Sequence, residues 1–199
     1  MAESDRALLV LDMQADAGGG VPPLAETILR FVQGELRYFR ERGRPVFFAL
    51  THLPAPLRSP VLDVAGASSS FTPVMLQEFT PRTDEPVIVK SSPSAFFHTP
   101  LQEHLDRSRV RRITLVGLET HTSVLLTAAD AFARGFDVIV PDPCVAAADP
   151  ELHKTALRLV RDAWPRFFGR APNAEEADET GRLRRVPSSS KPDVPPSEL

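Results

Sequence analysis

The sequence lacks several features that would each indicate a class of protein. Its 199 residues contain one cysteine, Cys144, which excludes internal disulfide bonds and fits a reducing compartment. Its apolar runs fall short of the roughly 18 residues of a membrane-spanning helix, so we expect no membrane partner. A net charge of −3 provides no basic surface for nucleic acid. The opening MAESDRALLV has no basic region before a long apolar one, so we expect no signal peptide and a cytoplasmic location.

What is present is typical of a globular enzyme-sized domain. Hydrophobic residues make up 42% of the chain and charged residues 25%. The length favours one domain, which we place at residues 1–172. Residues 173–199 are rich in Glu, Ser, Pro and Arg, and we expect a low-complexity, flexible C-terminal tail there.

Short apolar runs alternate with segments of helical spacing. The expected strands are 7–11, 45–50, 87–89, 110–116, 137–140 and a weaker 166–169. The expected helices are 24–42, one ending near 105 and capped by Thr99 or Ser94, 124–132 and 151–163, with a short one at 74–79 inside a long excursion at 53–86. This alternation predicts an α/β fold, a three-layer α/β/α arrangement around a roughly six-stranded parallel sheet.

The stretch from Gly117 to Gly135 organises the site that we expect. It follows a buried strand, and helical spacing resumes at Val124. Between them lie hydroxyl residues able to cap a helix, among them Thr120 and Ser123. Such a turn presents its side chains at the carboxyl end of a parallel sheet, where open α/β folds bind their ligands.

Two further polar residues stand at strand ends, Asp12 and Lys90. Because parallel strands bring their carboxyl ends to one edge, an acid, an amine and the Ser123 hydroxyl can converge there. Each also has an ordinary structural interpretation: Asp12 as a turn residue, Lys90 as a solvated strand end and Ser123 as a helix cap. The spacing alone leaves both interpretations open.

Three motifs stand out in the chain, LLVLDMQ at 8–14, VKSSPSAFFHTPL at 89–101 and VGLETHTSVLLTAADAFARG at 116–135. Together they resemble the isochorismatase-like hydrolases of the cysteine hydrolase superfamily. The resemblance runs from about residue 6 to 147 and implies a Rossmann-like hydrolase domain acting on a small organic molecule. Such families include nicotinamidases, carbamoyl and ureide amidases, and isochorismatases, so the substrate stays open.

The resemblance also implies roles for individual residues. Asp12 would be the general acid/base and Lys90 the positive partner, while position 123 would carry the nucleophile, a cysteine in the family but Ser123 here. The backbone N–H groups of Glu119 and Ser123 would form the oxyanion hole. A cis peptide bond would join Leu118 and Glu119.

Other expectations concern the surroundings of these residues. Candidates for the substrate pocket are Gln14, His52, Phe96, Phe97 and Thr120. The nicotinamidase branch has an Asp two residues before a His after the second strand, whereas here Leu50 precedes His52, so we expect no metal and no other cofactor. Cys144 is interpreted as a buried structural thiol. The apolar segment 95–97, with the resemblance, favours a homo-oligomer.

Three functions remain open. The first is hydrolysis of a C–N bond in an amide or ureide, with residue 123 as nucleophile and Asp12 as its base. The second is isochorismatase-type hydrolysis without a covalent intermediate, in which Asp12 protonates a vinyl ether and water attacks. The third is a catalytically degenerate binding or assembly protein that keeps the fold and the pocket.

Overall fold

The computed structural model describes residues 5–15, 22–52 and 74–164. The strands are β1 (Arg6–Leu11), β2 (Val46–Thr51), β3 (Val87–Lys90), β4 (Arg112–Leu118), β5 (Asp137–Ile139) and β6 (Val145–Ala146). The α-helices are α1 (Pro23–Glu41), α2 (Leu101–Arg107), α3 (Leu125–Ala133) and α4 (Pro150–Arg158). Shorter helical turns are η2 (Gln77–Phe79), η3 (Thr120–Val124), η4 (Asp142–Cys144) and η5 (Leu159–Ala163), of which η3 and η5 are π-helical.

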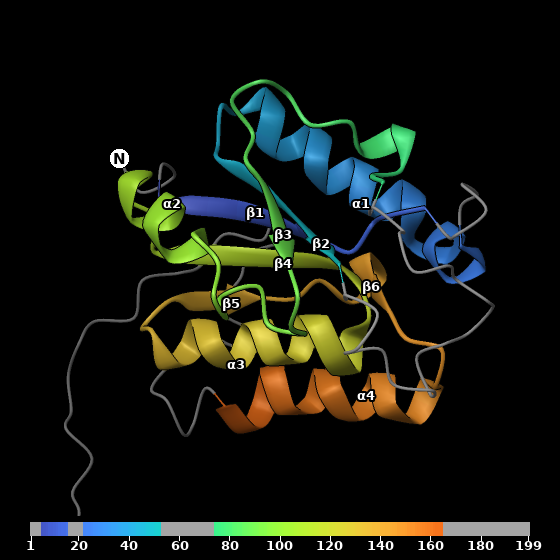
Figure 1. Cartoon of the computed structure of the whole chain (residues 1–199). Helices are drawn as coiled ribbons and strands as arrows, with labels where there is room; N and C mark the ends of the chain where they lie inside the picture. The colour runs from blue at the N-terminus through green and yellow to red at the C-terminus, as the bar shows by residue number, and fades with distance from the viewer. Residues whose placement is uncertain (1–4, 16–21, 53–73, 165–199) are drawn as a thin grey trace, which may run out of the picture.

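The strands form one parallel sheet in the order β3-β2-β1-β4-β5, with β6 also paired to β4. Helix α1 covers one face of the sheet, and α3 and α4 lie on the other (Figure 1). The predicted α/β fold with three layers and six parallel strands is therefore confirmed.

The apolar run of β1 explains why this strand is central. Leu9 and Leu11 pack in the core that includes residues of α2, α3 and α4, while Leu8 and Val10 pack in the core that includes α1. A strand buried on both faces needs apolar residues at every position, which is why the run is continuous rather than alternating. The charged and polar residues that follow it are thereby held at the edge of the sheet.

The sixth strand differs from the expectation. The weak strand predicted at 166–169 lies outside the described residues, as do the tail, the domain boundary at 172 and residues 53–73 of the excursion. The observed sixth strand is β6, two residues that continue along β4 beyond the point where β5 ends. Two residues carry no periodicity, so the sequence offered no signal for it.

The predicted helix caps are confirmed only in part. Helix α2 has Pro100 as its N-cap residue, but the hydroxyl of Thr99 accepts from the N–H of Leu101, the first residue of α2, at 3.3 Å. Ser94 instead donates its hydroxyl hydrogen bond to Asp130 of α3. In the turn after β4 the N-cap residue is Glu119. Thr120 and Ser123 therefore lie inside the helical turn η3 rather than at its cap.

Strands β1 and β4 approach each other closely at Gly117. Its φ is 113°, a left-handed value that favours glycine. A Cβ at this position would lie 1.9 Å from the carbonyl oxygen of Leu11, its register partner in β1. Only glycine fits between the two strands that lead to Asp12 and to η3.

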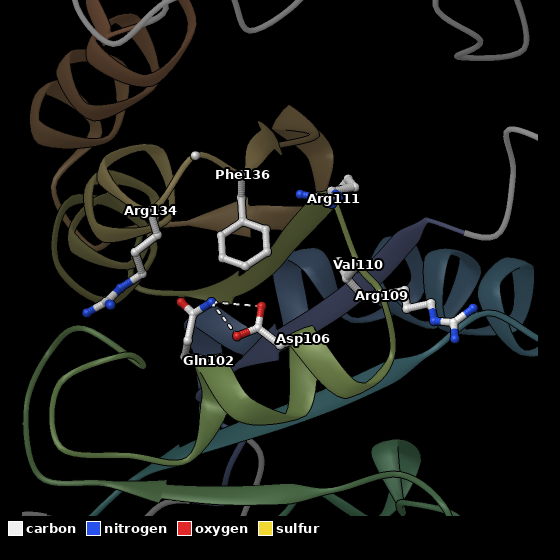
Figure 2. A pocket seen from close by; sticks show the side chains of 8 residues that line it. Gln102, Asp106, Arg109, Val110, Arg111, Arg134 and Phe136 are labelled. Carbon is white, nitrogen blue, oxygen red and sulfur yellow. Dashed lines mark hydrogen bonds between the residues drawn. The ribbon is translucent and has the colours of Figure 1, made fainter.

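A cavity of about 270 Å³ lies at the opposite, amino-terminal end of β4 and β5 (Figure 2). Gln102 and Asp106 of α2, joined by hydrogen bonds of 3.0 Å, line it together with Arg134 and Phe136. None of the candidate catalytic or substrate-pocket residues lines this cavity, so it is separate from the site at the carboxyl edge.

Candidate functional site

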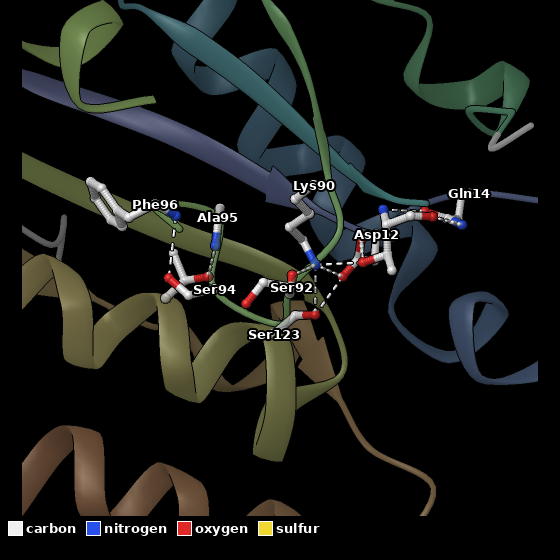
Figure 3. Close-up of polar contacts among 10 residues, drawn as sticks. Asp12, Gln14, Lys90, Ser92, Ser94, Ala95, Phe96 and Ser123 are labelled. Atoms are coloured by element: carbon white, nitrogen blue, oxygen red, sulfur yellow. Dashed lines mark hydrogen bonds and ion pairs between the residues drawn. The ribbon is translucent and has the colours of Figure 1, made fainter. Parts of the chain in front are cut away.

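Asp12, Lys90 and Ser123 meet at the carboxyl edge of the sheet (Figure 3). Ser123 Oγ donates to Oδ2 of Asp12 at 2.5 Å, and Lys90 Nζ lies 2.9 Å from the same oxygen. Lys90 Nζ also donates to Ser123 Oγ at 3.1 Å. The three groups form a closed triangle, which is the convergence that the strand ends predict.

The charges of this triangle are largely removed from water. The Lys90 side chain is 0% exposed and that of Asp12 is 12% exposed. An isolated ammonium at such a depth would be strongly disfavoured, so Lys90 depends on the carboxylate and on acceptors for its three N–H bonds. A buried, hydrogen-bonded acid and amine beside a hydroxyl can move a proton and stabilise negative charge on a bound substrate.

The backbone turns out of the sheet at Asp12. Its N–H still donates to the carbonyl of Ala49 in β2 at 2.8 Å, so the residue begins in sheet register. Its φ is 53°, in the left-handed region where Asp is among the few non-glycine residues enriched. This turn directs the carboxylate toward Lys90 and Ser123 instead of along the strand.

The turn that carries Ser123 is unusual in two respects. The peptide bond between Leu118 and Glu119 is cis, as the resemblance implies. Ser123 then lies in η3, a π-helical turn, which is a feature often found at functional sites. The carbonyl of Glu119 accepts from the N–H groups of Thr122 and Val124 at 3.2 and 3.1 Å, which fixes the turn. The oxyanion-hole role of Glu119 and Ser123 stays a prediction.

Sequence reasoning missed Thr51, the last residue of β2. Its hydroxyl donates to Oδ1 of Asp12 at 2.8 Å and accepts from Lys90 Nζ at 2.5 Å. Strand β2 lies between β1 and β3, so its end necessarily falls between Asp12 and Lys90. The order of the strands identifies Thr51, whereas the sequence alone indicated the next residue, His52.

Two of the five pocket candidates lie beside the triangle. Gln14 forms hydrogen bonds with the backbone of Thr51 through both ends of its amide, at 2.9 and 3.2 Å. His52 is half-buried and its N–H donates to the carbonyl of Lys90 at 2.8 Å. Gln14 therefore holds the backbone of Thr51, which contacts Asp12 and Lys90, while His52 directly follows Thr51.

Each of the other three candidates contacts residues outside the triangle. Phe96 is a core residue whose ring stacks on Phe136 at 6.0 Å, and Figure 3 shows it directed away from Lys90. Phe97 is 55% exposed. Thr120 is buried and its hydroxyl lies 2.9 Å from Nδ1 of His153 in α4. The pocket roles of Phe96, Phe97 and Thr120 stay predictions.

Cys144 is a buried thiol at the end of η4, as expected. Burial, followed by the nearby charge of Glu35, raises its pKa to about 12. A thiol with such a pKa is almost entirely protonated at neutral pH and is a poor nucleophile. Cys144 therefore does not replace the family's cysteine.

The part of the chain that the structure describes contains neither a metal-binding cluster nor a membrane-spanning helix. Across residues 5–15, 22–52 and 74–164, no group of three or more His, Cys, Asp or Glu side chains could hold a metal ion. No helix in this part of the chain is both long enough and apolar enough to span a bilayer.

Comparison with known proteins places the fold and the site in context. The family description "Isochorismatase domain" matches residues 6–168. Nicotinamidase 3 of Arabidopsis thaliana is 30% identical over 159 residues, 76% of this chain and 78% of the relative. A secreted isochorismatase effector of Verticillium dahliae is 28% identical, covering 80% of this chain and 85% of the relative. The crystal structure of N-carbamoylsarcosine amidase from Thermoplasma acidophilum superposes with a TM-score of 0.66 at 25% identity, covering 86% of this chain and 99% of that one.

Proposed function

Because this chain belongs to the isochorismatase family and is a hydrolase, we propose that it cleaves a C–N bond in a small amide or ureide with Ser123 as nucleophile. The observation that carries the proposal is the hydrogen bond from Ser123 Oγ to Asp12 Oδ2, at 2.5 Å. A hydroxyl already bonded to a carboxylate has its base in place before the substrate arrives.

The geometry supports a two-step reaction. Ser123 Oγ attacks the carbonyl carbon of the substrate while Asp12 takes the hydroxyl proton. The C–N bond then breaks, and that proton passes to the leaving nitrogen, so an ester of Ser123 remains. Water attacks the ester with Asp12 again as base, which releases the acid and restores the hydroxyl. Lys90 and the predicted oxyanion hole stabilise the negative charge on the carbonyl oxygen.

A serine at position 123 makes the reaction depend more strongly on Asp12 than a cysteine would. A thiol ionises near pH 8.5 in isolation, whereas an alcohol is protonated throughout the physiological range and must transfer its proton during attack. The short contact with Asp12 and the donation from Lys90 Nζ at 3.1 Å supply this assistance.

The proposal is tested with a panel of small primary amides, N-carbamoyl amines and ureides, assayed by release of ammonia or amine. We expect Asp12→Asn and Ser123→Ala to abolish turnover and Ser123→Cys to retain or raise it. Ser108→Ala, at the end of α2, is the matched control and keeps the parent rate. Mass spectrometry of the quenched enzyme should detect the ester on Ser123.

Other results would favour the alternatives. If Ser123→Ala is nearly silent while Asp12→Asn is inactive, the reaction proceeds without a covalent intermediate, as in isochorismatase-type hydrolysis. If the parent chain turns over neither this panel nor vinyl ether substrates, and Ser123→Cys does not either, a binding or assembly role replaces the proposal.

We also propose that the protein is cytoplasmic and forms a homo-oligomer. Exposure of Phe97 at 55% leaves an aromatic side chain available for contact with a second copy. Light scattering after size exclusion measures the mass in solution. A monomeric mass at micromolar concentration would contradict the homo-oligomer.

A further inference from the structure

The hydroxyl of Thr51 uses both of its hydrogen-bonding functions inside the polar centre. It donates to Oδ1 of Asp12 at 2.8 Å and accepts from Nζ of Lys90 at 2.5 Å. Thr51 and Lys90 are register partners in β2 and β3, so strand pairing itself places the two side chains together. The contact is therefore a property of the sheet and not of a mobile surface side chain.

Thr51 divides the two oxygens of Asp12 between different partners. With Oδ1 bonded to Thr51, Oδ2 receives Ser123 at 2.5 Å and Lys90 at 2.9 Å. Rotation of the carboxylate would break the bond to Thr51, because both oxygens leave their positions together. The Thr51 hydroxyl thus holds one defined oxygen toward the residue that attacks.

Thr51 also completes the coordination of Lys90. An ammonium has three N–H bonds, and Asp12, Ser123 and Thr51 are the closest acceptors, at 2.9, 3.1 and 2.5 Å from Nζ. The carbonyl oxygen of Ser92 is a fourth, more distant acceptor at 3.4 Å. Lys90 is fully buried, so an N–H without an acceptor would be costly. Replacing the Thr51 hydroxyl with a methyl group would remove the shortest of these bonds and leave the Ser92 carbonyl, at 3.4 Å, as the remaining acceptor.

The backbone of Thr51 is braced from the side of β1. Gln14 Oε1 accepts from the Thr51 N–H at 2.9 Å, and Gln14 Nε2 donates to the Thr51 carbonyl at 3.2 Å. One side-chain amide thereby makes the two bonds that a neighbouring strand would make with this residue. Gln14, Thr51 and Asp12 form a continuous chain of hydrogen bonds that ends at the proposed base.

We propose that Thr51 is a positioning residue: its hydroxyl holds Oδ1 of Asp12 and one N–H of Lys90, so that Oδ2 stays aligned with the side chain at position 123. Its catalytic meaning rests on the proposed function, but the alignment itself does not depend on the substrate. The groups facing the Asp12 carboxylate are Lys90 from β3, Thr51 from β2 and Ser123 from η3.

Valine and serine at position 51 separate the hydroxyl from the shape of the side chain. Thr51→Val keeps the shape but removes a donor to the carboxylate, and a carboxylate with fewer donors binds a proton more readily. Thr51→Ser keeps the hydroxyl and loses only a methyl group. A role in alignment predicts that valine disturbs the centre and serine does not.

The test uses Ser123→Cys as the background and measures the rate of alkylation by iodoacetamide against pH. The acid limb of this profile reports the proton shared by the new thiol and Asp12. We expect Thr51→Val to move the limb upward by about one pH unit, which is about tenfold slower alkylation on its acid side. Thr51→Ser should follow the background.

Thr114→Val is the matched control, because Thr114 is a buried threonine of β4 that accepts from Arg6 Nε at 2.9 Å, far from the centre. Circular dichroism checks folding, and Thr51→Ala replaces Thr51→Val if valine prevents it. An unchanged limb with Thr51→Val or Thr51→Ala, or an equal shift with Thr51→Ser or Thr114→Val, overturns the proposal. Lack of hydrolysis by the parent chain would count against the proposed function and leaves this alkylation test valid.

Discussion

Ser123 Oγ lies 2.5 Å from Asp12 Oδ2, although 111 positions separate the two residues in the sequence. The strands that lead to them, β4 and β1, are neighbours paired from Arg6 with Arg112 to Leu11 with Gly117. The contact is thus held by six consecutive register pairs and by a fully buried ammonium on its other side. A hydroxyl and a carboxylate held in this way are aligned before a substrate binds.

Removal of Lys90 should destabilise the protein strongly. Lys90→Met leaves the Asp12 carboxylate, only 12% exposed, without its cation, and breaking such a pair costs about 3–5 kcal/mol. Adding Asp12→Asn removes the unpaired charge, so the double variant should lose less than the sum of the single losses. Urea denaturation measures this cycle. Lys154→Met, in an exposed pair with Glu151, is the control and should lose at most about 0.5 kcal/mol. Additive losses would show that the pair is not coupled.

Cys144 should resist alkylation in the native state. Burial and the charge of Glu35 raise its pKa to about 12, so little thiolate exists at pH 8. Iodoacetamide should label it slowly in buffer and rapidly in denaturing urea. In Ser123→Cys, the new thiol beside Lys90 should react much faster than Cys144. Equal and slow labelling of both thiols would contradict an activated position at 123.

The pair between Arg40 and Glu85 should stabilise the fold above pH 4.5 but not in strong acid. Burial alone would raise the pKa of Glu85, but hydrogen bonds from Arg40 and from the N–H of Arg82, with the charges of both arginines, outweigh burial and lower it. The contribution is therefore complete above the unfolded value of 4.5 and is lost as pH falls through the lower folded value.

Thermal unfolding against pH checks this prediction. Glu85→Gln should melt lower than the parent near neutral pH, and the difference should shrink as the carboxylate of the parent becomes protonated. Glu103→Gln, in an exposed pair with Arg107, is the control and should change little at either pH. A difference that stays constant down to strong acid would show that the charge of Glu85 is not responsible.

The contact between His153 and Thr120 should stabilise the packing of α4 against the turn that carries Ser123. His153→Leu leaves the buried Thr120 hydroxyl without its partner, at a cost of about 1–3 kcal/mol. Hydrogen exchange of residues 120–124 should quicken in this variant. Adding Thr120→Val should recover most of the loss, because both polar groups are then replaced by apolar ones. Failure of the double variant to recover stability would assign the loss to the packing of α4 or to the contact of His153 Nε2 with Asp142 at 3.5 Å, and not to Thr120.

Much of the fold could be predicted because the apolar runs of the central strands are continuous and end at polar residues. Asp12 and Lys90 stand at the ends of β1 and β3, so parallel strands predicted that they could converge, although the spacing alone also allowed ordinary structural roles. β6 could not be predicted, since two residues have no period and its pairing depends on the space left beyond β5.

Side-chain direction was the information that the sequence did not contain. Phe96 and Phe97 look alike in the chain, but the first is 5% exposed and the second 55%, because the loop after β3 is shaped by the bonds of Ser94 and Ala95 to α3. At the end of β2, the sequence likewise does not say whether the side chain of Thr51 or of His52 contacts Asp12 and Lys90. Only the order of the strands in the sheet shows that it is Thr51.

The arrangement of Asp12, Lys90 and Ser123 depends on Gly117, a residue that has no side chain. A Cβ there would meet the Leu11 carbonyl at 1.9 Å, so any other amino acid would have to push β1 and β4 apart. Leu11 is the last residue of β1 and is followed directly by Asp12, and the chain beyond Gly117 leads through Glu119 to Ser123. The distance between Asp12, the proposed base, and Ser123, the proposed nucleophile, therefore depends on the absence of a side chain at position 117. A methyl group there would change this distance without touching either residue.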